Sequence, residues 1–331
     1  MNVASAPPPG RELFWLAPQL GALRQARARS RLPHALLIQD APGAGGDQLA
    51  LLAAQVALCS AADFPCGSCR DCQRAQAWSH PDLWYVAPEE DSRQIKVDQI
   101  RELNETLALS AHGSSASVAI ISPADLLNVN AANALLKTLE EPRPGVLIVL
   151  VATVTARLPA TVLSRCQRLP IRPPARAECA AWLRQQRGAG DWEAVLDVLG
   201  NAPLLALAAE PGEVLALRAE TEAQLEGALA GTTDLAAAAE RWSDGESYEL
   251  RLRCAENWVT RCLAGRLPGA PDVAELHTAA HLPIANSSMS IRSVVRLVDA
   301  LYELRRLATT TINKSLAVEQ LFWQLRAQRK S

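Results

Sequence analysis

Four of the eight cysteines in this chain lie within fourteen residues, at Cys59, Cys66, Cys69 and Cys72. A structural zinc ion takes four soft ligands in a tetrahedron, and Cys-x-x-Cys turns supply thiolate pairs at a suitable separation. Because four cysteines complete the shell, the pattern predicts a structural Zn²⁺ site and makes the nearby His80 a loop or cap residue. Separate reduced thiols are the alternative. Few basic residues surround the cluster, which favours a stabilising or protein-facing role over binding to nucleic acid.

A glycine-rich segment from Asp40 follows an apolar run and precedes a helical pattern. This is the setting of a phosphate-binding loop, where backbone N–H groups and the helix dipole attract an anion. A working loop reads G-x-x-x-x-G-K-[ST], in which the lysine reaches the phosphates and the hydroxyl holds magnesium. Aligning Gly43 and Gly45 with the inner residues puts Asp40 at the first glycine, Gly46 at the lysine and Asp47 at the hydroxyl position.

The missing lysine removes the essential cation from this loop. A carboxylate stands where a triphosphate would lie, and like charges repel. We therefore expect no functional ATP binding, in a loop that descends from a nucleotide site. On spacing alone, the segment could also be an ordinary strand-to-helix turn.

The elements that must position these residues alternate between short apolar runs and helical patterns. The predicted strands are residues 34–38, 82–86, 117–121, 146–152 and 167–171. The predicted helices are residues 47–58, 97–109, 131–140 and 158–163. In the second of these helices Val97, Ile100, Leu103 and Leu107 are spaced for one apolar face. Buried strands that alternate with helices predict an α/β fold with a mainly parallel sheet.

The pattern changes after Pro173 and Pro174, which mark a boundary. The rest of the chain is helical in pattern, in residues 175–200, 212–229, 233–242, 248–263, 291–311 and 315–329. We expect three parts: an α/β domain (residues 1–171) with an inserted zinc module (59–72), a small helical lid domain (172–208) and a helical C-terminal domain (209–331).

The composition is that of an ordinary globular protein, with 49% hydrophobic and 21% charged residues. A net charge of −2 gives no overall basic character that would favour nucleic-acid binding. No apolar run reaches the 18 or so residues of a membrane-spanning helix, and residues 1–10 read as a proline-rich leader instead of a secretory signal. We expect a cytoplasmic protein whose thiols stay reduced.

Several segments resemble the bacterial clamp-loader subunits, the gamma/tau and delta-prime families of AAA+ proteins. They are residues 31–37, the four cysteines, residues 97–103, residues 133–142 and residues 158–167. These segments follow the family's order over about residues 31–170, so the resemblance is specific. It implies an AAA+ domain followed by a small helical lid and a helical collar domain.

The resemblance also suggests which subunit type this is. Active ATPases of the family carry an Asp-Glu pair after the third strand, and here Pro123 and Ala124 fall at those positions while Asp125 comes one position late. Pro203 falls where active subunits carry a sensor arginine. Together with the altered loop, these losses resemble delta-prime and imply a subunit without ATPase activity of its own.

Ser164, Arg165 and Cys166 keep the family's motif. The resemblance implies that Arg165 is an arginine finger, offered in trans to the nucleotide of a neighbouring subunit. Without that context, a lone arginine before an apolar strand would be a surface ion pair. Cys166 is expected to pack in the interior, because no histidine lies nearby in sequence to activate it.

The implied role is in DNA replication, as a part of the DNA polymerase III holoenzyme. The implied partners are the gamma/tau ATPase subunits, the delta subunit, the sliding clamp indirectly, and primed DNA through the complex. Two alternatives stay open. A divergent DNA-dependent AAA+ ATPase would hydrolyse ATP by itself, and a standalone zinc-dependent DNA-binding protein would bind DNA in a salt-sensitive way.

Overall fold

The structure is a computed structural model that describes residues 13–90, 92–108, 116–243, 245, 247–264, 291–307 and 313–327. Its contacts divide the chain into two compact units, Met1–Pro174 and Ala175–Ser331. The boundary directly follows Pro173 and Pro174. The expected further division at residue 208 stays a prediction, as does the leader over residues 1–10, all of which lies outside the described residues.

The first unit is built on a five-stranded sheet in the order β2-β3-β4-β1-β5, and every pairing is parallel. The strands are β1 (Ala35–Gln39), β2 (Leu83–Val86), β3 (Ser117–Ile121), β4 (Val146–Ala152) and β5 (Gln167–Pro170). Every residue of β3 and β4 is buried, which is why these strands read as continuous apolar runs. The sheet confirms the predicted α/β fold.

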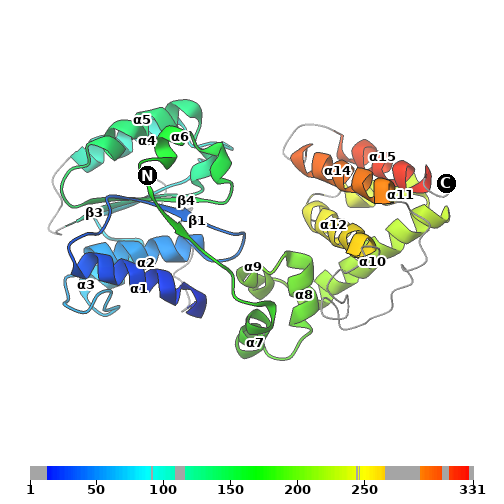
Figure 1. The fold of residues 1–331 in the computed structure, drawn as a ribbon, viewed down its shortest axis with the longest axis horizontal. Helices are drawn as coiled ribbons and strands as arrows, with labels where there is room; N and C mark the ends of the chain where they lie inside the picture. Colours follow the sequence, from blue (N-terminus) through cyan, green and yellow to red (C-terminus); the bar gives the residue numbers. More distant parts are fainter. Residues whose placement is uncertain are drawn as a thin grey trace. The chain divides into compact units, whose positions relative to one another are not determined.

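Helices cover both faces of this sheet (Figure 1). On one face lie α1 (Ala17–Ala28), α2 (Gly46–Leu58) and α3 (Arg70–Gln76), and on the other lie α4 (Val97–Ala108), α5 (Val129–Glu140) and α6 (Ala160–Leu163). The apolar stripe predicted for residues 97–109 faces the core, because Ile100 and Leu103 are fully buried. Leu109, the last residue predicted for this helix, falls outside the described residues.

Two helices of this unit were missed by the sequence analysis, namely α1 and α3. In α1 only Leu23 is buried, so the helix has no regular apolar stripe. Helix α3 has seven residues, too few for a periodic pattern to stand out. Short 3₁₀ turns complete the unit: η2 (Phe14–Leu16), η3 (Ala124–Leu126) and η4 (Thr155–Arg157).

The second unit is helical, as predicted. Its described helices are α7 (Arg176–Arg187), α8 (Trp192–Leu199), α9 (Pro203–Ala208), α10 (Pro211–Ala230), α11 (Leu235–Trp242), α12 (Tyr248–Ala264), α14 (Ile291–Leu307) and α15 (Lys314–Ala327). The pattern over residues 175–200 is two helices, because Gly188 breaks it with φ +86°. The predicted ends at Thr311 and Arg329 fall outside the described residues.

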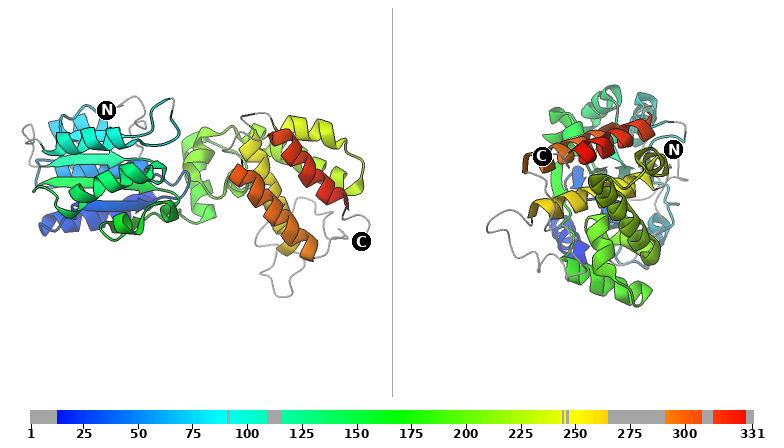
Figure 2. Two further views of the ribbon diagram at one scale, coloured as in Figure 1. Left: turned by 90° about the horizontal axis from the view of Figure 1, so that it is seen from above. Right: turned by 90° about the vertical axis from the view of Figure 1, so that its right-hand side faces the viewer.

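Helices α14 (orange) and α15 (red) lie side by side in this unit (Figure 2). Trp242 of α11 is buried among them, edge-on to Phe322 of α15 at 5.0 Å between ring centroids. Among the helices that the structure describes, none has the length and apolar character needed to cross a bilayer.

A charged cluster joins four helices of the second unit. Asp197 of α8 pairs with Arg176 of α7 at 3.1 Å, with Arg218 of α10 at 3.5 Å and with Arg261 of α12 at 3.8 Å. Arg218 and Arg261 also share the carboxylate of Glu222. The side chains of Arg261 and Asp197 are only 8% and 13% exposed, so the contact between them is shielded from solvent, whereas Arg176 is 39% exposed.

Candidate functional site

The glycine-rich loop connects β1 to α2 at one end of the sheet. Strand β1 ends at Gln39, and α2 begins at Gly46 after Gly45, which adopts φ +99° as its N-cap. Only glycine adopts this left-handed conformation without strain. The local order of strand, turn and helix is therefore that of a phosphate-binding loop.

The side chain of Asp40 fills the space in which the lysine of a working loop would begin. A Cβ atom on Gly46 would lie 2.6 Å from Cγ and Oδ2 of Asp40 and 2.7 Å from Cγ1 of Val151. No side chain fits at position 46 unless both neighbours move. The backbone N–H groups of Gly46 and Ala41 donate hydrogen bonds to the Asp40 carboxylate. The loop thus holds a carboxyl group of its own where it would otherwise offer N–H groups to a ligand.

Burial makes this carboxylate hard to ionise. Burial first, and then the nearby charge of Asp47, raise the pKa of Asp40 to about 7, although the N–H groups of Gly46 and Ala41 act to lower it. Oδ1 of Asp40 is buried and has no hydrogen-bond partner among the residues that the structure describes. The loop therefore contains an acid that is poorly compensated when charged.

The magnesium end of the loop is also closed. Burial raises the pKa of Asp47, while hydrogen bonds from Ser122 and Tyr85 lower it, with 3.5 Å between Oη of Tyr85 and Oδ1 of Asp47. Ser122 and Tyr85 were not singled out in the sequence. They come from the ends of β3 and β2, neighbouring parallel strands whose carboxyl ends meet at one edge of the sheet.

The residues expected at the Asp-Glu positions offer no carboxylate. Pro123 is exposed and Ala124 is buried, and neither side chain has an oxygen. Asp125 accepts a hydrogen bond from the backbone N–H of Thr153 at 3.3 Å. On the other side of the loop, Trp15 donates from Nε1 to the carbonyl oxygen of Ala44 at 2.8 Å.

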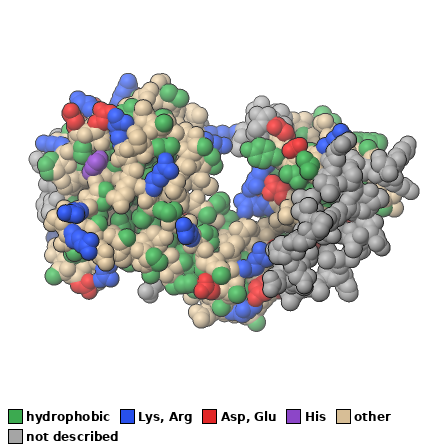
Figure 3. Space-filling model, viewed as in Figure 1, with side chains coloured by type: hydrophobic (Ala, Val, Ile, Leu, Met, Phe, Trp, Pro, Cys, Tyr) green, Lys and Arg blue, Asp and Glu red, His purple; other side chains and the backbone are tan. Residues whose placement is uncertain are grey.

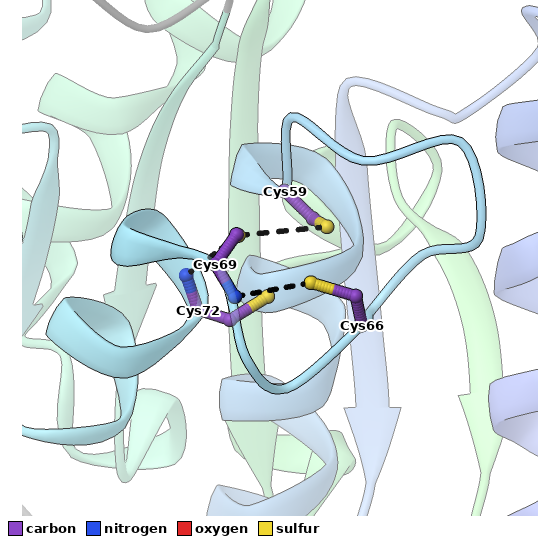
Figure 4. Close-up of side chains that lie close together, drawn as sticks. All are labelled: Cys59, Cys66, Cys69 and Cys72. Atoms are coloured by element: carbon purple, nitrogen blue, oxygen red, sulfur yellow. Dashed lines mark hydrogen bonds between the residues drawn. The ribbon is translucent and has the colours of Figure 1, made fainter.

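The four cysteines converge in space. Cys59 directly follows α2, Cys66 lies in the connecting loop, Cys69 is the N-cap of α3 and Cys72 lies in its first turn. Their Sγ atoms all lie within 4.8 Å of one another, and those of Cys59 and Cys69 are 3.8 Å apart (Figure 4). A tetrahedron with Zn–S bonds of about 2.3 Å has edges of about 3.8 Å. The group could hold a metal ion and fits a structural zinc.

Backbone N–H groups already point at two of these sulfurs. Cys69 donates to Sγ of Cys66 at 3.2 Å, and Cys72 donates to Sγ of Cys69 at 3.4 Å. Such bonds stabilise the thiolate, and they lower the pKa of Cys66 to about 6 and also lower that of Cys69. Gly67 makes the turn between the first pair possible, with φ +70°. All eight cysteines are free thiols.

The cysteine module is attached to α1 and α2 by polar contacts. The guanidinium of Arg27 donates to the carbonyl oxygens of Val56 and Cys59 and lies 4.2 Å from the ring centroid of Phe64. Gln55 donates to the carbonyl oxygen of Cys72 at 3.1 Å.

His80 lies outside the thiol group. It is buried between Asp71, at 3.6 Å, and the backbone N–H of Asp82, which donates to Nδ1 at 3.0 Å. This contact agrees with a loop or cap role for the histidine.

Arg165 lies just after α6, with its side chain 33% exposed. One terminal nitrogen is 2.5 Å from Oε1 of Glu140, and the other donates to the carbonyl oxygen of Thr161 at 2.7 Å and to Oγ of Ser164 at 3.3 Å. Cys166 is partly buried, and burial raises its pKa to about 11, so it is a poor nucleophile at neutral pH. Glu140 was not singled out in the sequence as a partner of this arginine.

Comparison with known proteins gives consistent matches. The sequence model of the family described as "DNA polymerase III, delta subunit" matches residues 17–175. The DNA polymerase III subunit delta' of Haemophilus influenzae is 38% identical over 196 residues, covering 58% of this chain and 60% of that protein. The Escherichia coli subunit delta' is 38% identical over 208 residues, covering 61% and 60%. The chain thus spans about 60% of the length of these curated relatives.

A solved structure shares the fold. The crystal structure of a DNA polymerase III gamma subunit-related protein from Thermotoga maritima aligns with a TM-score of 0.51 at 17% identity, covering 94% of this chain and 99% of that one. The likeness extends over both units and is one of fold alone.

Proposed function

We propose that this chain serves as a non-catalytic delta' subunit of a clamp loader, because residues 17–175 match the family model described as "DNA polymerase III, delta subunit" and the chain is 38% identical to two delta' subunits over the matched residues. In this role it helps to load the sliding clamp onto primed DNA. It supplies an arginine to ATP hydrolysis in a neighbouring subunit of the ring, and it has no functional ATP-binding site of its own.

The observation that carries this proposal is the occupied phosphate loop. Position 46 has no room for a lysine, and the loop's N–H groups at Gly46 and Ala41 serve the Asp40 carboxylate. A nucleotide would have to displace a half-buried acid while bringing several negative charges next to Asp40 and Asp47. In this proposal, ATP is therefore bound and hydrolysed by neighbouring subunits and not by this chain.

Arg165 is the proposed contribution to a neighbour's site. Its guanidinium is partly exposed, and its hydrogen bonds to Thr161 and Ser164 fix its direction. An arginine delivered in trans to a γ-phosphate increases the rate by about 10³–10⁵ in known cases. The proposed recipient is a gamma/tau-type ATPase subunit.

The second unit offers a surface for the proposed collar. Val295, Val298 and Tyr302 of α14 follow one another at helical spacing and are 48%, 44% and 69% exposed. Helices associate through apolar stripes of this kind. We propose that they pack against helices of the delta and gamma/tau subunits.

DNA contact is proposed to be shared within the complex. On the face shown in Figure 3, the Lys and Arg side chains of the first unit lie in separate small groups among hydrophobic and neutral atoms. With a net charge of −2, this arrangement favours DNA binding by the assembly over binding by this chain alone. Zinc is proposed to stabilise the cysteine module.

The experiment is reconstitution with gamma/tau and delta subunits, followed by DNA- and clamp-stimulated ATP hydrolysis. We expect Arg165→Ala to keep assembly and to lower the ATPase rate at least tenfold. Arg168→Ala is the matched control, an exposed arginine three residues along the chain. An unchanged rate in Arg165→Ala would refute the trans arginine.

The alternative function is that of a divergent DNA-dependent ATPase. Measurements on the isolated chain distinguish it from the proposed function. Calorimetry with ATP and Mg²⁺ is expected to show no binding at millimolar nucleotide, because Asp40 and Asp47 occupy the loop. ATP hydrolysis by the isolated chain would favour the alternative.

A further inference from the structure

The carboxylate of Glu140 forms an ion pair with Arg165, the arginine that the proposed function needs. Glu140 is the last residue of α5, and its Oε1 lies 2.5 Å from a terminal nitrogen of Arg165. The other partners of the guanidinium are neutral oxygens of Thr161 and Ser164. Of the three partners, only Glu140 brings a charge that cancels that of the arginine.

A trans arginine acts through its net positive charge and its free N–H groups. A carboxylate in contact with the guanidinium neutralises that charge and uses donors that a phosphate oxygen would need. It would also stand close to the arriving phosphate, where like charges repel. The neutral contacts to Thr161 and Ser164 can persist while a phosphate is bound, but the contact to Glu140 competes with it.

We propose, on the basis of the proposed function, that Glu140 holds Arg165 in a masked state and releases it only when a neighbouring subunit presents its nucleotide phosphate. The masking carboxylate and the phosphate exchange places on the same guanidinium. Glu140 is thus a positioning residue that sets when the arginine can act.

The contact is weak enough to be exchanged. Arg165 and Glu140 are 33% and 49% exposed, and pairs of such exposure shift an equilibrium by at most about fivefold. Glu140 also stands at the C-terminal end of α5, where the helix dipole disfavours a negative charge. Removing its charge should therefore not unfold the helix.

Glu140→Gln tests the proposal, with Glu141→Gln as the matched control. Glu141 is the next residue and is exposed, and no ion pair involves it among the described residues. In the reconstituted complex, we expect Glu140→Gln to raise the ATPase rate without DNA by about two- to fivefold. The gain should be smaller with primed DNA and clamp, when the arginine is already engaged, and Glu141→Gln should change neither rate.

The double variant Glu140→Gln/Arg165→Ala separates this proposal from the proposed function. If both hold, the double variant matches Arg165→Ala. A Glu140→Gln rate that is unchanged or lower, with Arg165→Ala still impaired, would overturn the masking role and leave the trans arginine intact. An unimpaired Arg165→Ala would instead overturn the proposed function. If Glu140→Gln melts at a lower temperature than wild type, a second test uses Glu140→Ala in the isolated chain. NMR relaxation of the Arg165 side chain then reports the mobility of its guanidinium. A mobility that is unchanged from wild type would refute the contact.

Discussion

Replacing Asp40 by asparagine should stabilise the first unit, and more so at higher pH. The change keeps the shape of the side chain and an oxygen for the N–H of Gly46, but removes the charge. Asp40 is half-buried, its Oδ1 atom is buried without a hydrogen-bond partner among the described residues, and its pKa rises from 3.8 to about 7 on folding. At about 1.36 kcal/mol per pH unit, this rise corresponds to about 4 kcal/mol of penalty on the charged form.

The sign follows from proton binding. Between pH 4 and 7 the native state holds a proton on Asp40 that the unfolded state has lost, so stability falls as the pH rises through this window and levels off above 7. An asparagine has no such proton to lose. We expect Asp40→Asn to raise the free energy of unfolding by about 2–4 kcal/mol at pH 8 and by less than about 2 kcal/mol at pH 5.

The assay is urea unfolding at pH 5, 6, 7 and 8. Unfolding is monitored by the hydrogen exchange of peptides from β1 and α2, so that the first unit is measured separately from the second. Asp98→Asn is the control, because that carboxylate is 83% exposed on α4. A gain that is absent at pH 8, or equal at pH 5 and 8, would refute the view of Asp40 as a buried acid that resists ionisation.

Two further predictions concern the cysteine module. Cys66→Ser should lower the zinc content of the purified protein, since it removes one of four converging thiols. Elemental analysis beside Cys254→Ser checks this, and undiminished zinc would count against the site. Arg27→Ala should speed zinc release to a chelator several-fold, because its guanidinium holds the carbonyl oxygens of Val56 and Cys59. The exposed Arg29→Ala should leave the rate unchanged, and equal rates for both variants would contradict the role of Arg27.

The sequence was most informative where chemistry is local. The strands that flank the loop are continuous apolar runs, and the cysteine spacing brings its four thiols together by short-range turns, so both could be read directly. Helix α1 could not, because its single buried residue, Leu23, leaves no periodic signal. Its role in the module depends on Arg27 reaching backbone atoms that are 29 and 32 residues away in sequence.

The candidate site likewise contains features that the sequence predicts and contacts that it does not. Alignment of the loop locates Gly46 and Asp40 at altered positions, but it does not reveal that the carboxylate turns back onto the N–H of Gly46. Tyr85 and Ser122 reach Asp47 because β2 and β3 are neighbours in the sheet, which strand order alone decides. Glu140 meets Arg165 across 25 residues of chain, a distance over which no periodicity applies.

The charged cluster around Asp197 gives the second unit a mechanical property. One carboxylate ties α7 and α8 to α10 and α12 through three arginines, two of which are braced again by Glu222. A movement of α12 relative to α7 would therefore have to break or rearrange these ion pairs, so the cluster links the four helices within the second unit.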